Sequence, residues 1–139
     1  MLLSTGALTL HYGDDIAWEI EYSPNGVDSG LCVGVARTAF QNEGVTLQPC
    51  GISGRTVWIL DPGDSPATIN HDDVPVINGS DTNFSHPFVM TYPKNGHPTD
   101  SPRPQVFVQN LTGFSHGPGD PISSVRDNQL WGADWGVLR

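Results

Sequence analysis

Short apolar runs, each interrupted by Gly, Asn or Pro, follow one another along this 139-residue chain. They are densest between residues 30 and 60, where runs rich in Val, Leu and Ile cover residues 31–36, 44–50 and 55–60. Runs of this length, bounded by helix-breaking residues, are typical of consecutive short strands joined by loops. The pattern therefore predicts an all-β chain.

The pattern of strands recurs on both sides of this central region. Further strands are expected at residues 74–78, 86–92, 105–110 and 128–131. A shorter version precedes the centre, with strands near residues 7–10 and 16–20 and an opening strand that is missing or very short. Repetition at this period indicates an internal repeat. The expected units are about 1–20, 21–62 and 72–139, together forming a single domain.

Both cysteines of the chain lie in the central unit. Cys32 is in the first apolar run and Cys50 ends the second. An even pair on neighbouring strands is what a disulfide needs, and two buried free thiols are the alternative. A disulfide would imply an oxidising compartment, although the first ten residues lack the basic and apolar regions of a signal peptide.

A tryptophan near the end of each expected unit completes the repeat. The three residues are Trp18, Trp58 and Trp131. A large ring under each hairpin is expected to pack in the core. The alternative is that one or more of these rings stacks on the face of a sugar.

The central unit resembles one repeat of the ricin B-type lectins. Those repeats place Cys-Leu-x-Val, a loop, Leu-x-x-Cys and then a turn into Gln-x-Trp, and this chain has residues 32–35, 47–50 and 56–58 in those places. The resemblance implies a β-trefoil with pseudo-threefold symmetry and an incomplete first repeat. It also implies that the three tryptophans are buried in equivalent positions.

The resemblance also implies where a sugar would bind. In these lectins the site uses an Asp two residues after the first Cys and an Asn-Gln pair before the Trp. The central unit has Gly34 and Arg55-Thr56 instead, which predicts that its site is lost. The third unit keeps the amide pair, although its Asp position falls near Val89. The expected carbohydrate-binding residues are Asn128, Gln129 and Gln109, with Asp127 and Tyr92 as neighbours. The alternative is that Asn128 and Gln129 hydrogen-bond the backbone of their own turn.

Charge and composition limit the classes of partner that this chain is expected to bind. Six basic residues against fifteen acidic ones argue against nucleic acid and anionic membranes. No apolar run approaches eighteen residues, so no membrane insertion is expected. Residues 71–73 are His-Asp-Asp, and three adjacent polar residues in a loop rarely converge on one ion, so no metal site is expected. No catalytic motif is evident, so no cofactor and no catalytic activity are expected either.

These observations predict a carbohydrate-binding, lectin-like secreted protein that takes a glycan or glycoprotein without catalysis. Two alternatives stay open: a protein-binding trefoil such as a protease inhibitor, and an accessory domain of an enzyme. The loops at residues 93–104 and 113–125 are long for a compact domain, and such loops are often functional. The first contains four prolines and could present a rigid binding surface.

Overall fold

The computed structural model describes residues 16–60, 73–80, 86–97, 99–111, 127–129 and 131–132. Within these residues the chain is all-β, as the pattern of apolar runs predicts: every strand pairs antiparallel, and the helical turns are 3-10 segments of three or four residues. None of the described helices is long and apolar enough to cross a membrane.

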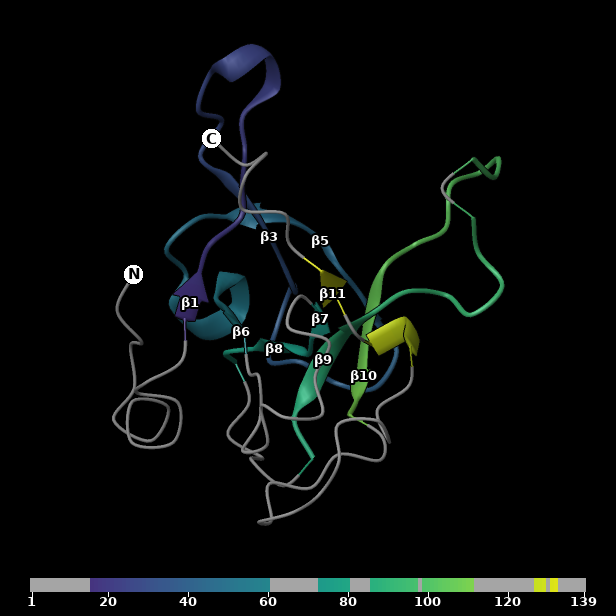
Figure 1. The fold of residues 1–139 in the computed structure, drawn as a ribbon. Coiled ribbons are helices and arrows are strands. Elements are labelled where there is room, and N and C mark those ends of the chain that lie inside the picture. Colours follow the sequence, from purple (N-terminus) through teal and green to yellow (C-terminus); the bar gives the residue numbers. More distant parts are fainter. Residues whose placement is uncertain are drawn as a thin grey trace.

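The described strands form three sheets (Figure 1). The largest has the order β1-β6-β8-β9-β10-β4, and its strands are Ile16–Trp18, Trp58–Leu60, Val76–Asn78, Phe88–Thr91, Phe107–Asn110 and Glu43–Gly44. A three-stranded sheet joins β2 (Glu21–Tyr22), β3 (Leu31–Gly34) and β5 (Thr46–Pro49). A third pairs β7 (Asp73–Val74) with β11 (Trp131–Gly132). The 3-10 turns are η1 (Pro24–Gly26), η2 (Ser53–Thr56) and η5 (Asp127–Gln129).

Two stretches of the chain pair their strands in the same way. In the early unit (residues 16–60), β3 pairs with β5 so that Cys32 faces Gln48. In the late unit (the described part of residues 73–132), β9 pairs with β10 so that Val89 faces Gln109. The same offset relates the other pairs of these two hairpins. Gln109 is therefore the counterpart of Gln48, as the sequence pattern predicts.

Hydrogen bonds outside the strands repeat as well. The indole of Trp58 donates to Val33 O at 2.8 Å, and that of Trp131 donates to Met90 O at 2.8 Å. The amide of Val35 donates to Arg55 O, just as that of Tyr92 donates to Asn128 O. These repeated contacts anchor the 3-10 turn and final strand of each unit on its first hairpin.

Strand pairing corrects the prediction for Trp18. This residue lies in β1 and faces Trp58 across the β1–β6 pair, whereas Val74 of β7 faces Trp131. The counterpart of Trp18 is therefore Val74, and Trp18 is on the first strand of the early unit, not on the last strand of a preceding one. The prediction that all three tryptophans occupy equivalent positions is wrong for Trp18.

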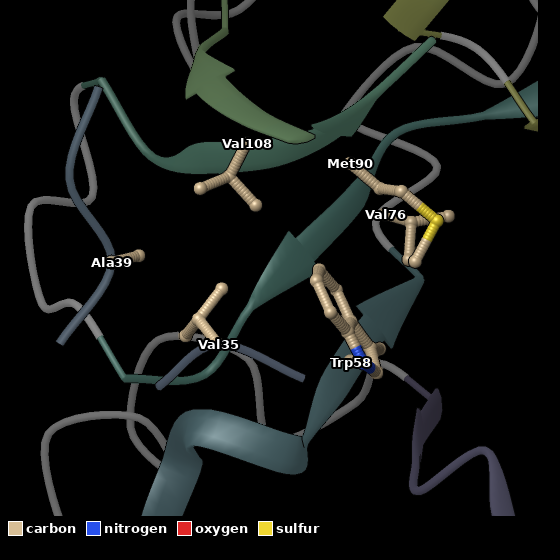
Figure 2. Close-up of a cluster of buried hydrophobic side chains, with 6 residues drawn as sticks. All are labelled: Val35, Ala39, Trp58, Val76, Met90 and Val108. Atoms are coloured by element: carbon tan, nitrogen blue, oxygen red, sulfur yellow. The ribbon is translucent and has the colours of Figure 1, made fainter. Parts of the chain in front are cut away.

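The core lies where the two units meet (Figure 2). The early unit contributes Val35, Ala39 and Trp58, and the late unit contributes Val76, Met90 and Val108. Pairing of β6 with β8 and of β4 with β10 joins the units along their edges. Removal of these apolar side chains from water is the main favourable contribution of this core to the stability of the fold.

The predicted disulfide between Cys32 and Cys50 is confirmed, with an S–S distance of 2.05 Å. It joins β3 to the residue that follows β5. The corresponding positions of the late unit are Val89 and Leu111, and both are buried. The same two positions are therefore occupied by a disulfide in the early unit and by two buried apolar residues in the late unit.

Candidate functional site

The amide pair before Trp131 is engaged inside the protein. Gln129 is only 1% exposed, and its side-chain amide donates to Asn110 O at 3.2 Å and to Thr91 Oγ1 at 3.4 Å. Asn128 Nδ2 donates to Tyr92 O at 2.9 Å. The acceptors of these bonds lie in or next to β9 and β10 and not in the turn of Asn128 and Gln129 itself, so these contacts fix the turn on that hairpin. A sugar-binding role for the two amides stays a prediction.

The neighbours expected for that pair have separate surroundings. Tyr92 packs its ring edge-on against Trp131, with centroids 6.4 Å apart, and its buried hydroxyl has no hydrogen-bond partner in the described part of the chain. The backbone of Asp127 begins η5, while its side chain lies outside what the structure describes. Gln109 faces the early unit and donates to Asn42 Oδ1 at 2.7 Å. The structure thus gathers Asn128, Gln129 and Tyr92 around η5, and Gln109 belongs to another surface.

The position that the resembled lectins give to Asp also differs from the sequence prediction. Strand register makes Thr91, not Val89, the counterpart of Gly34. Thr91 is fully buried and donates to Val89 O. At Gly34 an added Cβ would lie 2.7 Å from Arg55 O, so a side chain there would collide with η2. Neither unit can present a carboxylate at this position in the observed packing.

A different polar surface forms where a turn of the early unit meets β10. The turn is closed by a hydrogen bond from Glu43 N to Phe40 O, and Asn42 adopts a left-handed conformation with φ 66°. Asparagine tolerates this conformation better than most residues. The turn is fixed to β10 because Asn42 N donates to Val108 O at 2.9 Å and Asn110 N donates to Gln41 Oε1 at 2.9 Å.

Four amide side chains lie around this junction, which we call the amide surface: those of Gln41 and Asn42 come from the turn, and those of Gln109 and Asn110 come from the end of β10. Three hydrogen bonds hold these four side chains. Gln41 Oε1 accepts from Asn110 N, and Gln109 Nε2 donates to Asn42 Oδ1. Asn110 Nδ2 donates to His86 O. The opposite ends of the four amides have no partner among the described residues. They supply two donors (Gln41 Nε2 and Asn42 Nδ2) and two acceptors (Gln109 Oε1 and Asn110 Oδ1).

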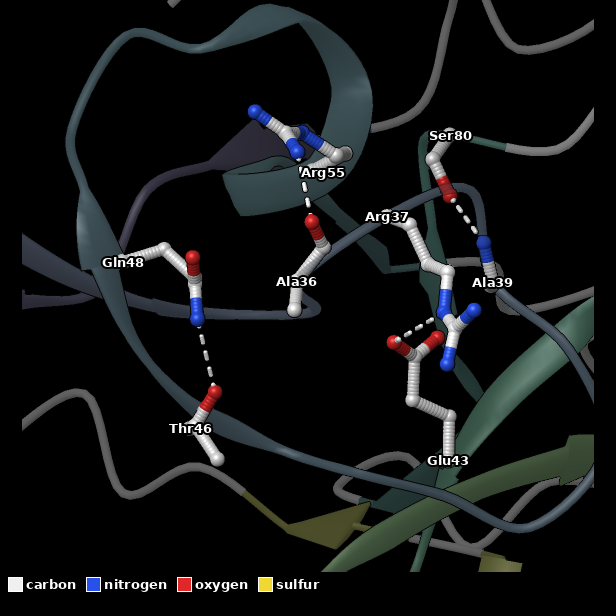
Figure 3. A network of polar contacts seen from close by, with 8 residues as sticks. All are labelled: Ala36, Arg37, Ala39, Glu43, Thr46, Gln48, Arg55 and Ser80. Carbon is white, nitrogen blue, oxygen red and sulfur yellow. Dashed lines mark hydrogen bonds and ion pairs between the residues drawn. The ribbon is translucent and has the colours of Figure 1, made fainter.

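An aromatic ring and an ion pair border the amide surface. Phe40, which opens the turn, is 40% exposed, and the guanidinium of Arg37 lies 4.5 Å from its ring centroid. Arg37 Nε also lies 4.0 Å from Glu43 Oε1 (Figure 3). Glu43 is buried, and its Oε2 has no hydrogen-bond partner within the described residues. An exposed aromatic face therefore lies next to amides with fixed orientation and a buried acceptor.

Sequence reasoning identified Gln109 but missed Phe40, Gln41 and Asn42. The missed residues are in a loop between predicted strands, and they reach Gln109 only through pairing of β4 with β10 across more than sixty positions. The available signal was local: an aromatic followed directly by two amides, next to Glu-Gly. Such a cluster indicates a turn and says nothing about the strand on which the turn lies.

Comparisons with models of protein families, with characterised proteins and with solved structures find no match to this chain. The geometry of the amide surface and the pairing of the strands therefore carry the functional argument.

Proposed function

We propose that this protein binds carbohydrate on the amide surface, next to the ring of Phe40. The observation that carries the proposal is the set of four amides that are each held at one end and have no partner at the other end among the residues that the structure describes. Amides fixed in this way can exchange donors and acceptors with adjacent sugar hydroxyls at little further loss of conformational freedom.

The chemistry of the surrounding residues supports a sugar over other ligands. An exposed aromatic ring can cover the apolar face of a pyranose while amides bind its hydroxyls. The surface is formed by one turn and the end of one strand, so the proposed binding is shallow and weak per site.

We further propose that the fold follows the β-trefoil plan of the ricin B-type lectins and that the protein is secreted and non-catalytic. Matched indole-to-carbonyl bonds in the two units support the plan, because they repeat the Trp contact around which each unit is built. The disulfide supports an oxidising compartment. A glycan or glycoprotein is the proposed partner.

Glycan-array screening followed by calorimetric titration with the best soluble oligosaccharide tests the proposal. We expect Phe40→Ala and Gln109→Ala each to weaken binding by roughly tenfold or more, the loss of about 1.4 kcal/mol. The matched control is Gln48→Ala, because Gln48 is the counterpart of Gln109 in the early unit and bonds only its own strand neighbour Thr46 among the described residues.

Equal affinity in the two test variants and the control would contradict the amide surface as the binding site. Thermal unfolding of each variant separates the two effects, because Phe40 and Gln109 are on the surface and their truncation leaves the core intact. A variant that loses binding at an unchanged melting temperature supports a contact with the ligand.

A further inference from the structure

One apolar face of the three-stranded sheet in the early unit is largely exposed, whereas the equivalent face in the late unit is buried. Val33 of β3 pairs with Leu47 of β5 on one side and with Ile20, the residue before β2, on the other. The counterparts of Ile20, Val33 and Leu47 in the late unit are Val76, Met90 and Val108. The late row belongs to the core, with Val108 fully buried. In the early row Ile20 is 42% exposed and Leu47 is 43% exposed.

A second row extends the same face of the early sheet. Tyr22, Leu31 and Pro49 face one another across the same three strands, and all three are exposed. We call the exposed members of the two rows the open face: Ile20, Tyr22, Leu31, Leu47 and Pro49. Val33, between them, is partly buried and packs against the core cluster. An apolar face of this kind on a folded chain marks an interaction surface.

The elements that bury the late row show what would cover the open face. The segment 35–45 of the early unit runs along the edge of β10, with Asn42 N bonded to Val108 O and Val45 N bonded to Val106 O, and it contributes Val35 and Ala39 to the core. On the open face the corresponding outer edges of β2 and β5 pair with no strand among the described residues. The covering element of the open face should therefore be a segment equivalent to 35–45.

The late unit has such a segment, and its ends contact the rest of the chain through Tyr92, Gln105 and Val106. By strand register the counterpart of 35–45 is the loop between β9 and β10, and its described residues, 92–97 and 99–106, project away from the sheets (Figure 1). Its shape is maintained by its own contacts: Gly96 N donates to Pro93 O, Asp100 N donates to His97 O, and His97 N donates to Asp100 Oδ2. These contacts connect described residues of the projecting loop to one another.

The projecting loop and the surroundings of the open face carry charges of opposite sign. The projecting loop contains Lys94 and Arg103, two of the six basic residues of the chain, against the single acid Asp100. Both basic side chains are exposed. The strands and hairpin that form the open face contain the acids Glu21 and Asp28 and no Lys or Arg. Opposite charge around an apolar centre favours this orientation over others.

We propose that the open face is the docking site for a second copy of this chain. The projecting loop of one copy lies along the outer edge of β5 of the other, as segment 35–45 lies along β10 within one copy. Because each copy has both surfaces, two such contacts related by a twofold axis close a dimer. The amide surface is formed by other residues and remains on the outside of each copy.

Sedimentation velocity over a wide concentration range tests the proposal on the full chain. We expect a reversible dimer that is weakened at least tenfold by Leu47→Glu, which places a charge on the open face, and similarly by the double variant Lys94→Glu with Arg103→Glu. The control Thr38→Glu adds the same charge at an exposed position outside both surfaces.

Mixing the two defective variants gives the sharper result. Leu47→Glu retains an intact loop and the double loop variant retains an intact open face, so one correct contact can form only between unlike copies. We expect the mixture to contain heterodimer at concentrations where each variant alone is monomeric. A monomeric wild-type chain at every concentration, a mixture without heterodimer, or an equal effect of Thr38→Glu would overturn the proposal.

Discussion

Gly54 shows how closely the two units approach at single residues. It lies in η2, and an added Cβ would be 1.9 Å from Gly79 O, directly after β8. Backbone cannot yield as the end of a flexible side chain can. The contact explains why the turn before Trp58 reads Ser-Gly-Arg-Thr and tolerates no side chain at its second position.

We predict that Gly54→Ala lowers the free energy of unfolding by roughly 2–3 kcal/mol because it overpacks this contact. The matched control is Gly44→Ala, where an added Cβ would meet the side chain of Gln105 at an ordinary 3.7 Å. Urea unfolding measures both. Equal stabilities of the two variants would show that η2 and the residue after β8 are not in contact.

Gln129 is the residue at which a fold role and a binding role can be separated. We predict that Gln129→Ala destabilises the chain by about 2 kcal/mol, because it removes hydrogen bonds from a buried site. Glycan affinity should stay unchanged at temperatures well below unfolding. Lost binding at an unchanged melting temperature would instead place the ligand at the turn before Trp131.

Among the elements, the β3–β5 hairpin differs from its counterpart in a way that experiment can measure. The early hairpin is closed by the disulfide, whereas the late one has Val89 and Leu111 in the same places. In the chain-entropy view, a disulfide stabilises by restricting the unfolded chain, and more so when it closes a longer loop.

We predict that replacing both Cys32 and Cys50 by Ala costs about 3 kcal/mol of unfolding free energy. Replacement by the residues of the late unit, Cys32→Val with Cys50→Leu, should recover part of that loss through apolar contact. Urea unfolding of the two double variants provides the comparison. An unchanged stability in the Ala variant would mean that the covalent link contributes nothing to this hairpin.

The local pattern of apolar and polar residues is sufficient to predict where the strands lie but not which strands pair with one another. Residues 31–36, 44–50 and 55–60 contain the observed β3, β5 and β6 because short apolar runs between breakers encode strands directly. Trp18 was misassigned because a strand with a central Trp reads alike at either end of a unit, and only pairing with β6 distinguishes them.

The candidate site was harder to predict for the same physical reason. Asn128 and Gln129 match a motif in sequence, yet burial of Gln129 depends on Asn110 and Thr91 from other strands. Phe40 and Asn42 carry no motif, and they gain a neighbour such as Gln109 only through tertiary pairing. Motifs identify residues, whereas the surfaces they form depend on long-range register.

At the scale of the whole molecule, the two proposals support each other without depending on each other. A single shallow sugar site gives weak binding, and a dimer with two outward-facing amide surfaces would raise the apparent affinity for a glycan that spans both. The net charge of −9 opposes close approach of copies, and this repulsion is screened at physiological salt.

The central claim, carbohydrate binding on the amide surface, is tested most directly by nuclear magnetic resonance. Side-chain amide signals are followed while the best oligosaccharide from the array is added to the ¹⁵N-labelled chain. We predict that the signals of Gln41, Asn42, Gln109 and Asn110 shift together and saturate at one affinity, while that of Gln48 does not move. Shifts confined to Asn128 and Gln129, or no saturable shift at the four amides, would contradict the account.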